Sequence, residues 1–308
     1  MSRCIAAVIA TYRRPSELAR LLASLQGVDA VVVCNNGADS AVRAVCESAP
    51  VSTTCLDSKE NIGCGGGLRL AEEDVWRRFR DQLSHLLVLD DDAQLEADTV
   101  IQLADVMESE HAAVVYPLVA GPGGRVGWTP GLKDRAKHRL GAESLSVADY
   151  RERFRAPFAE FDWAQGICLL VRREAMDAAG FHRGDFWVRG EDLDFSLRLT
   201  ACGRGIFAPG ILVKHLPPNN SATSSPRAEF LRHAAMIQNI AYLTCRQPHG
   251  RRIALSLPGA SRRFLSTWGI DAAPDLARAL WRGVVRAEAA GQGDGRTFFQ
   301  RFKEVAKE

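Results

Sequence analysis

The sequence of 308 residues predicts an α/β fold with a mostly parallel central sheet flanked by helices. Short apolar runs alternate with amphipathic stretches as far as residue 90, which is the pattern of consecutive βαβ units. Polar, glycine and acidic residues follow those runs, at the strand ends where such sheets bind ligands. Hydrophobic residues make up 46% of the chain and charged residues 25%, a composition typical of a globular protein with a core.

The first part of the chain supplies four short apolar runs separated by amphipathic segments. The runs predict strands at residues 4–10, 30–34, 51–56 and 85–89. The segments between them predict helices at residues 15–25, 39–48 and 68–80. Right-handed crossovers join such strands, so their carboxyl ends are expected to meet at one edge of the sheet.

The second part is less regular. Residues 117–157 lose periodicity and are rich in glycine, proline and basic residues, which is typical of a binding loop or lid. Around that stretch the sequence predicts a helix at 96–109 and strands at 112–116 and 161–171. Next come expected helices at 173–179 and 191–201, one or two strands within 206–215, and an amphipathic helix at 228–245.

Charge and cysteine content limit the classes of function. The formal net charge of +2 predicts no nucleic-acid partner. Eight cysteines without a CxxC pair favour a reducing cytoplasm over a disulfide framework. No apolar run approaches the ~18–20 residues of a transmembrane helix, and the apolar start is too short for a signal peptide. We therefore expect a cytoplasmic protein.

Basic and aromatic residues lie together in the tail, at Arg262, Arg263, Phe264 and Trp268. Such a pattern can seat a helix on an anionic lipid surface, at the inner face of the membrane. The alternative, which this pattern alone favours, is a solvated helical cap that packs on the sheet, and contact with the membrane surface stays open.

Three acids, Asp90, Asp91 and Asp92, follow the fourth apolar run directly. Adjacent carboxylates repel one another unless a cation or hydrogen-bond donors lie between them. Oxygen ligands of this kind suit Mg²⁺ or Mn²⁺. The alternative is a solvated acidic turn at the start of the next helix.

The stretch Asn61–Gly67 is glycine-rich and lies between an expected strand and helix. Glycines there let the backbone approach a phosphate at a helix N-terminus. A dinucleotide-binding fingerprint would instead follow the first strand, where Thr11–Arg14 contains no glycine. The alternative is a bend whose glycines serve packing alone.

Glu191 and Asp192 begin an expected helix just after Trp187, and His215 ends an apolar run. A carboxylate walled by aromatic rings can act as a general base, because desolvation raises its proton affinity. An imidazole readily completes a Mn²⁺ shell. The alternatives are acids that complement the helix dipole and a structural histidine.

Six of these segments occur in an order that resembles the family 2 glycosyltransferases, which are inverting enzymes with the GT-A fold. The segments are Ala10–Arg14, Cys34–Gly37, Asn61–Gly66, Asp90–Asp92, Gly190–Asp192 and His215. The acidic triplet and the helical tail are most similar to the bacterial galactofuranosyl- and rhamnosyltransferases. The resemblance implies a catalytic domain at 1–227, with a nucleotide-binding half at about 1–116 and an acceptor half at about 117–227. A C-terminal helical region would follow at 228–308.

The resemblance also implies a donor site. Asn36 would face the base, and Asp90 would contact the nucleotide or its ribose. Asp91 would also belong to the nucleotide-binding residues and would help Asp92 to hold the metal. The remaining donor residues by resemblance are Thr11, Tyr12, Arg13, Asn61, Gly63, Gly65 and Gly66.

The chemistry would lie next to that site. Asp92 and His215 would hold Mn²⁺ or Mg²⁺, and Asp192 would deprotonate the acceptor hydroxyl while Glu191 orients the acceptor. Trp163 and Trp187 would offer faces to sugar rings.

The expected function is transfer of a sugar, of the galactofuranose or rhamnose type, from a UDP- or dTDP-sugar to a glycan or lipid-linked acceptor. A sugar nucleotidyltransferase is the first alternative, although it would want a glycine-rich basic loop after the first strand. A non-catalytic nucleotide-sugar or glycan-binding relative is the second. Oligomeric state is left open by the sequence.

Overall fold

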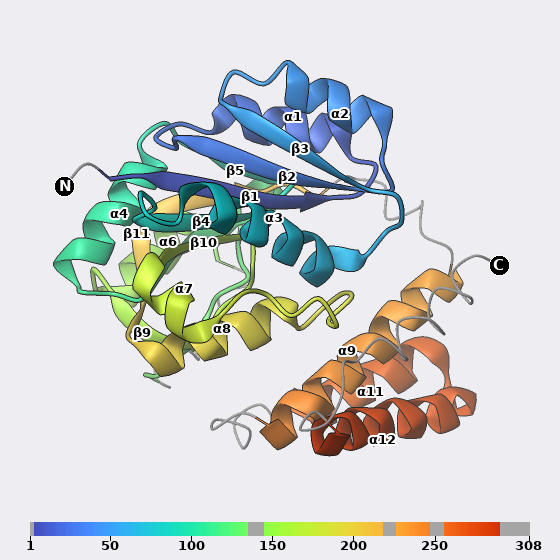
Figure 1. Cartoon of the computed structure of the whole chain (residues 1–308). Helices are drawn as coiled ribbons and strands as arrows, with labels where there is room; N and C mark the ends of the chain where they lie inside the picture. Colours follow the sequence, from blue (N-terminus) through green and yellow to red (C-terminus); the bar gives the residue numbers. More distant parts are fainter. Residues whose placement is uncertain (1–2, 135–144, 218–225, 247–255, 290–308) are drawn as a thin grey trace.

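The computed structural model describes residues 3–134, 145–217, 226–246 and 256–289, and its arrangement is drawn in Figure 1. One mixed sheet runs through the molecule in the order β3-β2-β1-β4-β10-β6-β11-β9-β8. Helices flank this sheet, and a separate group of C-terminal helices, drawn in orange and red, lies beside it (Figure 1).

The first part of the chain builds a parallel half-sheet, as expected. Its strands are β1 (Ile5–Thr11), β2 (Ala30–Asn36), β3 (Thr53–Ser58) and β4 (His85–Asp90). The connecting helices are α1 (Pro15–Ser24), α2 (Ser40–Glu47) and α3 (Gly63–Phe79). β1 pairs in parallel with both β2 and β4, and β2 with β3, so all four carboxyl ends lie at one edge. β2 is buried along its whole length, in agreement with the apolar run Ala30–Cys34 that makes up most of it.

The second half-sheet begins with an antiparallel strand. β10 (Cys168–Arg172) lies between β4 and β6 (Val114–Ala120) and is antiparallel to both. β11 (Gly205–His215) then pairs in parallel with β6, so the centre of the sheet is mostly parallel. Short strands complete the sheet at its periphery: β5 (Ala93–Leu95), β7 (Val126–Gly127), β8 (Gly131–Leu132) and β9 (Ala159–Trp163).

The helices of the second part are α4 (Thr99–Ser109), α6 (Val147–Phe154), α7 (Arg173–Ala179) and α8 (Glu191–Cys202), with a 3₁₀ turn η1 at Pro122–Gly124. The single strand expected at 161–171 is wrong, because the chain turns between β9 and β10. The irregular stretch at 117–157 is also more ordered than expected. Its described part holds the end of β6, the strands β7 and β8, and α6.

The described part of the tail is helical, as expected, and consists of α9 (Pro226–Arg246), α11 (Ser256–Trp268), the 3₁₀ turn η4 (Ile270–Ala272) and α12 (Ala273–Ala289). The rest of the expected helical region, at 247–255 and 290–308, lies outside the described residues. These helices share a small core of their own around Ile237, Phe264 and Leu276. Asn239 of α9 donates hydrogen bonds to the carbonyls of Val188 and Arg189, which tie the helical group to the segment before α8. Within the described residues, no helix has the length and apolar character needed to cross a bilayer.

Candidate functional site

The carboxyl end of β4 carries the acidic triplet, and its geometry is set by a strand that the sequence did not predict. Asp90 is the last residue of β4, and β5 follows the triplet immediately. β5 pairs antiparallel with the end of β11, with His215 opposite Ala93. The Leu216 amide also donates to the Asp92 carbonyl at 2.9 Å. This pairing brings His215 to the acids although 123 positions separate it from Asp92 in the chain.

Asp90, Asp92 and His215 form a cluster of possible metal ligands. One ligand atom from each lies within 4.8 Å of the others. His215 Nε2 is 2.8 Å from Asp92 Oδ1 and 3.8 Å from Asp90 Oδ2. The Trp128 ring and the imidazole pack at right angles to one another, with ring centroids 4.4 Å apart.

The charges of the cluster fit a divalent cation. Burial and the neighbouring Asp92 carboxylate raise the pKa of Asp90 to about 7. Burial also opposes charge on His215, but its hydrogen bond with Asp92 and the charges of the three acids together outweigh burial and raise the pKa of His215. Two carboxylates and an imidazole are a donor set that Mn²⁺ accepts. A cation at this position would relieve the repulsion between the two acids.

Asp91 points away from this cluster. Its carboxylate accepts a 2.6 Å hydrogen bond from the Thr11 hydroxyl and a 3.0 Å bond from the Arg14 guanidinium. The same guanidinium nitrogen donates to Asp92 Oδ2 at 3.0 Å. Thr11 and Arg14 therefore fix the acidic turn from the side of β1. The sequence did not predict a role for Arg14. The only available signal was its place at the end of the Thr11–Arg14 segment.

Asp192 lies beside Asp90 through a shared turn. The Asp90 amide donates to the Ile167 carbonyl at 3.1 Å, and the adjacent Gly166 amide approaches Asp192 Oδ2 at 3.4 Å. The Leu193 amide also donates to Asp192 Oδ1 at 2.7 Å. Burial raises the pKa of the Asp192 carboxyl, and the Asp192 charge in turn contributes to the raised pKa of Asp90. The turn between β9 and β10 therefore holds Asp192 next to the metal-ligand cluster.

Glu191, which precedes Asp192 at the start of α8, is buried. Burial, followed by the charge of Asp192, raises the pKa of Glu191 to about 8. Its carboxyl also has a hydrogen bond with the Cys64 thiol, which links α8 to the first turn of α3. At neutral pH Glu191 is therefore mainly protonated and can donate a hydrogen bond.

The glycines of the Asn61–Gly67 stretch have a packing role that the sequence left open. A Cβ at Gly63 would lie 2.2 Å from the Trp187 carbonyl oxygen, and one at Gly65 would lie 2.4 Å from that of Phe186. The Cys64 amide donates to the Trp187 carbonyl at 2.8 Å. The first turn of α3 therefore lies directly against the segment that leads into Glu191 and Asp192, where side chains would not fit.

Neighbouring predicted donor residues also support this first turn of α3. Asn36 is buried, and its amide donates to the Gly63 carbonyl at 3.2 Å while its oxygen accepts from the Ile62 amide at 3.2 Å. The Asn61 side chain accepts from the Gly63 amide at 2.9 Å. The nearest neighbour of a Cβ at Gly66 would be the Ile62 side chain, at 3.2 Å. Asn36 therefore holds α3 in place, and its contact with a base remains a prediction.

Tyr12 and Arg13 are exposed at the end of β1, with the Arg13 guanidinium over the Tyr12 ring at 5.2 Å. Trp187 is half-buried beside the first turn of α3, and its indole nitrogen approaches the Asn61 carbonyl at 3.4 Å. Trp163 is half-buried against the cluster around Phe186. Sugar contacts of both tryptophans remain predictions.

The comparisons with known proteins agree with this arrangement. A family model described as glycosyltransferase like family 2 matches residues 2–232. A galactofuranosyltransferase of Mycobacterium tuberculosis, GlfT1, is 27% identical over 209 residues, which cover 66% of each chain. The chain thus spans just under two thirds of the length of this curated relative.

Solved structures share the fold at low sequence identity. Residues 1–349 of TarS from S. aureus match with a TM-score of 0.57 and 14% identity, covering 92% of this chain and 80% of TarS 1–349. GalNAc-T7 in complex with UDP, GalNAc and Mn²⁺ matches with a TM-score of 0.55 and 16% identity, covering 77% of this chain and 47% of GalNAc-T7. The architecture is the GT-A fold that the sequence resemblance implied, and the chain belongs to glycosyltransferase family 2.

Proposed function

We propose that this protein is a metal-dependent inverting glycosyltransferase that moves a sugar from a nucleoside-diphosphate donor to an acceptor hydroxyl. The observation that carries the proposal is the position of Asp192. Its carboxylate contacts the turn at Gly166, and the next residue, Ile167, accepts a hydrogen bond from Asp90 of the cluster of two carboxylates and an imidazole. The cluster lies at the carboxyl edge of the parallel strands. Ligands of open α/β sheets bind at this edge.

Asp90, Asp92 and His215 would hold a divalent ion against the donor diphosphate. Such an ion, Mn²⁺ or Mg²⁺, supplies Lewis-acid stabilisation of the negative charge on the departing diphosphate. GalNAc-T7 is described with UDP and Mn²⁺ together, which favours Mn²⁺ in a fold of this kind. Arg14 keeps Asp92 oriented toward the cluster, because its guanidinium binds the other oxygen of that carboxylate.

Asp192 would act as the general base. The acceptor oxygen attacks the anomeric carbon from the face opposite the diphosphate, the bond from that carbon to the diphosphate oxygen breaks, and the hydroxyl proton passes to Asp192. A single displacement of this kind inverts the configuration. The raised pKa of Asp192 suits a carboxylate that must accept a proton. Protonated Glu191 would donate a hydrogen bond that orients the acceptor.

The donor would lie over the ends of β1 and β4. Tyr12 and Arg13 are exposed there and would contact the nucleotide, while the first turn of α3 would border the diphosphate. The name of the relative GlfT1 favours galactofuranose as the transferred sugar, and complexes of TarS with UDP and UDP-GlcNAc favour a uridine nucleotide. A glycan or lipid-linked glycan is the acceptor class that fits.

A panel of nucleotide-sugars tests the proposal. We expect UDP-galactofuranose to raise the melting temperature more in the presence of Mn²⁺ than in its absence, and more than dTDP-rhamnose does. Substitution Asp192→Asn should lower transfer by about 10²–10⁴-fold, the usual contribution of a general base, with donor affinity unchanged. Wild-type turnover in this variant would refute the assignment of the base.

A further inference from the structure

The helix α12 has one face packed on α9 and an opposite face that is apolar and exposed. Leu276 and Ala279 are buried, and Gly283 lies so close to α9 that a Cβ would be 2.4 Å from the Gln238 carbonyl oxygen. On the opposite face Trp281 is 68% exposed and Val285 is 38% exposed. These two residues are four positions apart, so their side chains lie one above the other on the helix.

Ile270, in η4 just before α12, is 74% exposed. Among the described residues five large hydrophobic side chains are exposed by 38% or more, and three of them are Ile270, Trp281 and Val285. Exposed apolar side chains are therefore concentrated on one segment of the C-terminal helices. A concentration of this kind marks an interaction surface more often than scattered single residues do.

The C-terminal helical region also differs from the rest of the chain in charge. Residues 226–289 contain ten arginines and four acidic residues, a formal charge of +6, whereas residues 1–225 carry 25 basic and 30 acidic residues, a charge of −5. Arg262 and Arg263 of α11 are exposed. Although the net charge of the whole chain is +2, the helical region is basic and residues 1–225 are acidic.

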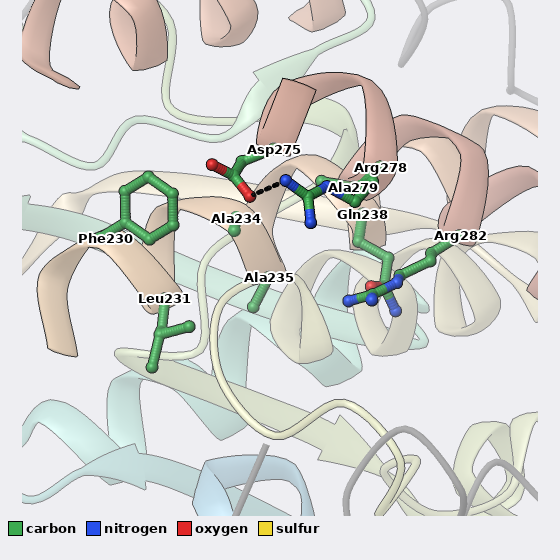
Figure 2. Close-up of a pocket in the computed structure, with 9 residues that line it drawn as sticks. All are labelled: Phe230, Leu231, Ala234, Ala235, Gln238, Asp275, Arg278, Ala279 and Arg282. Carbon is green, nitrogen blue, oxygen red and sulfur yellow. Dashed lines mark ion pairs between the residues drawn. The ribbon is translucent and has the colours of Figure 1, made fainter. Parts of the chain in front are cut away.

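Two arginines of α12 also border a pocket between α9 and α12, with a volume of about 110 Å³ (Figure 2). Phe230, Leu231 and Ala234 give it an apolar wall, while Arg278 and Arg282 lie at its other side. Arg278 pairs with Asp275 at 2.9 Å, yet its side chain remains 64% exposed. An apolar wall beside guanidinium groups is chemically suited to an anionic phospholipid headgroup and the first part of its chain.

We propose that the exposed face of η4 and α12, together with the arginines of α11 and α12, binds the surface of an anionic phospholipid bilayer. Trp281, Ile270 and Val285 would enter the boundary between headgroups and acyl chains, and the arginines would lie among the lipid phosphates. α9 contacts both α12 and the segment before Glu191, so the bound enzyme would hold its base close to the bilayer.

That last consequence rests on the proposed function, because it favours a lipid-linked acceptor. The binding itself does not, since vesicles without donor or acceptor test it. Failure of transfer with intact vesicle binding, or the reverse, would therefore separate the two proposals.

Sedimentation of the full chain with vesicles provides the test. The chain should bind vesicles of phosphatidylcholine mixed with phosphatidylglycerol, bind weakly to phosphatidylcholine alone, and lose affinity as salt is added. Substitution Trp281→Ser should lower the partition coefficient by about tenfold. The double variant Arg278→Gln/Arg282→Gln should lower it by about fivefold for each arginine.

Matched controls lie on other helices. Ile101 on α4 is 48% exposed, so Ile101→Ser makes the same kind of change as Trp281→Ser outside the proposed surface. Arg20→Gln/Arg43→Gln removes two partly exposed arginines of α1 and α2. Both controls should bind vesicles as the wild type does.

Three outcomes would overturn the proposal. The first is no binding of the wild type to phosphatidylglycerol vesicles, and the second is an equal loss of binding in the controls. The third is a dimer in light scattering that Trp281→Ser converts to a monomer, without any effect on vesicles, because the face would then join two copies of the chain. Circular dichroism of each variant verifies that it is folded.

Discussion

Gly65 occupies the first turn of α3, where an added methyl group would collide with the segment that leads into α8. The new Cβ would lie 2.4 Å from the Phe186 carbonyl oxygen and 2.7 Å from that of Arg183. Real Cβ contacts stay beyond 3.0 Å, so the two segments must separate by at least 0.6 Å at Phe186. Both obstacles are backbone atoms, so no side-chain rotation can relieve the collision.

The substitution Gly65→Ala should therefore affect both stability and transfer. Overpacking of this kind costs about 1–3 kcal/mol, partly offset by up to about 1 kcal/mol of gained helix propensity. Glu191 is also in the way, with its Cβ 3.3 Å from the added atom, so α8 has to shift and carry Asp192 with it. A displacement approaching 1 Å at a catalytic group costs about 100-fold in rate. We expect turnover to fall between about tenfold and 100-fold.

Gly259→Ala is the control, because Gly259 lies in the helix α11 and its added Cβ would meet nothing within 4 Å. Steady-state transfer and urea unfolding of the two variants measure the effects. We expect Gly259→Ala to keep wild-type turnover and to be at least as stable as the wild type. Wild-type turnover in Gly65→Ala would refute the argument that this close contact positions Asp192.

Three further predictions concern the acidic residues. Asp92→Ala should weaken Mn²⁺ binding, measured by calorimetry with UDP present, by more than about tenfold, and an unchanged affinity would contradict its role as a ligand. Thr11→Val should lower the free energy of unfolding by about 1–3 kcal/mol, because it leaves the buried Asp91 carboxylate one hydrogen bond short, whereas Thr11→Ser should not. Folding raises the pKa of Glu191 from 4.5 to about 8, so the unfolded chain binds fewer protons between these values and stability should fall as pH rises through them. Glu191→Gln should flatten that fall, and an identical pH dependence of unfolding in the variant would contradict the buried, protonated carboxyl.

Local sequence patterns were sufficient for the parallel half of the sheet. A short, continuous apolar run such as Ala30–Cys34 is typical of a strand that is buried on both faces of a sheet. It therefore predicts β2 without information on the tertiary structure. The same logic placed the acidic triplet at the edge where ligands bind. Gln165 and Gly166, which interrupt the run at 161–171, were the available signal for the turn between β9 and β10.

The convergence of the site depends on contacts that are distant in the sequence. His215 reaches Asp92 because a three-residue strand, β5, pairs with the end of β11, and nothing local in Ala93–Leu95 specifies that partner. Arg14 is one of several arginines after the first strand, and only the fold selects it to bind Asp91 and Asp92. The glycines of α3 looked suited to phosphate, whereas their tightest contacts are with the chain itself. Long-range pairing of this kind leaves no local periodicity to detect.

The position of Mn²⁺ in crystals grown with UDP-galactofuranose tests the central claim most directly. Anomalous diffraction at the manganese edge should place one ion between Asp92 and His215, on the donor diphosphate, with the Asp192 carboxylate facing the open side of the anomeric carbon. An ion bound elsewhere, or a sugar that lies away from Asp192, would contradict the assignment of these residues to one reaction centre.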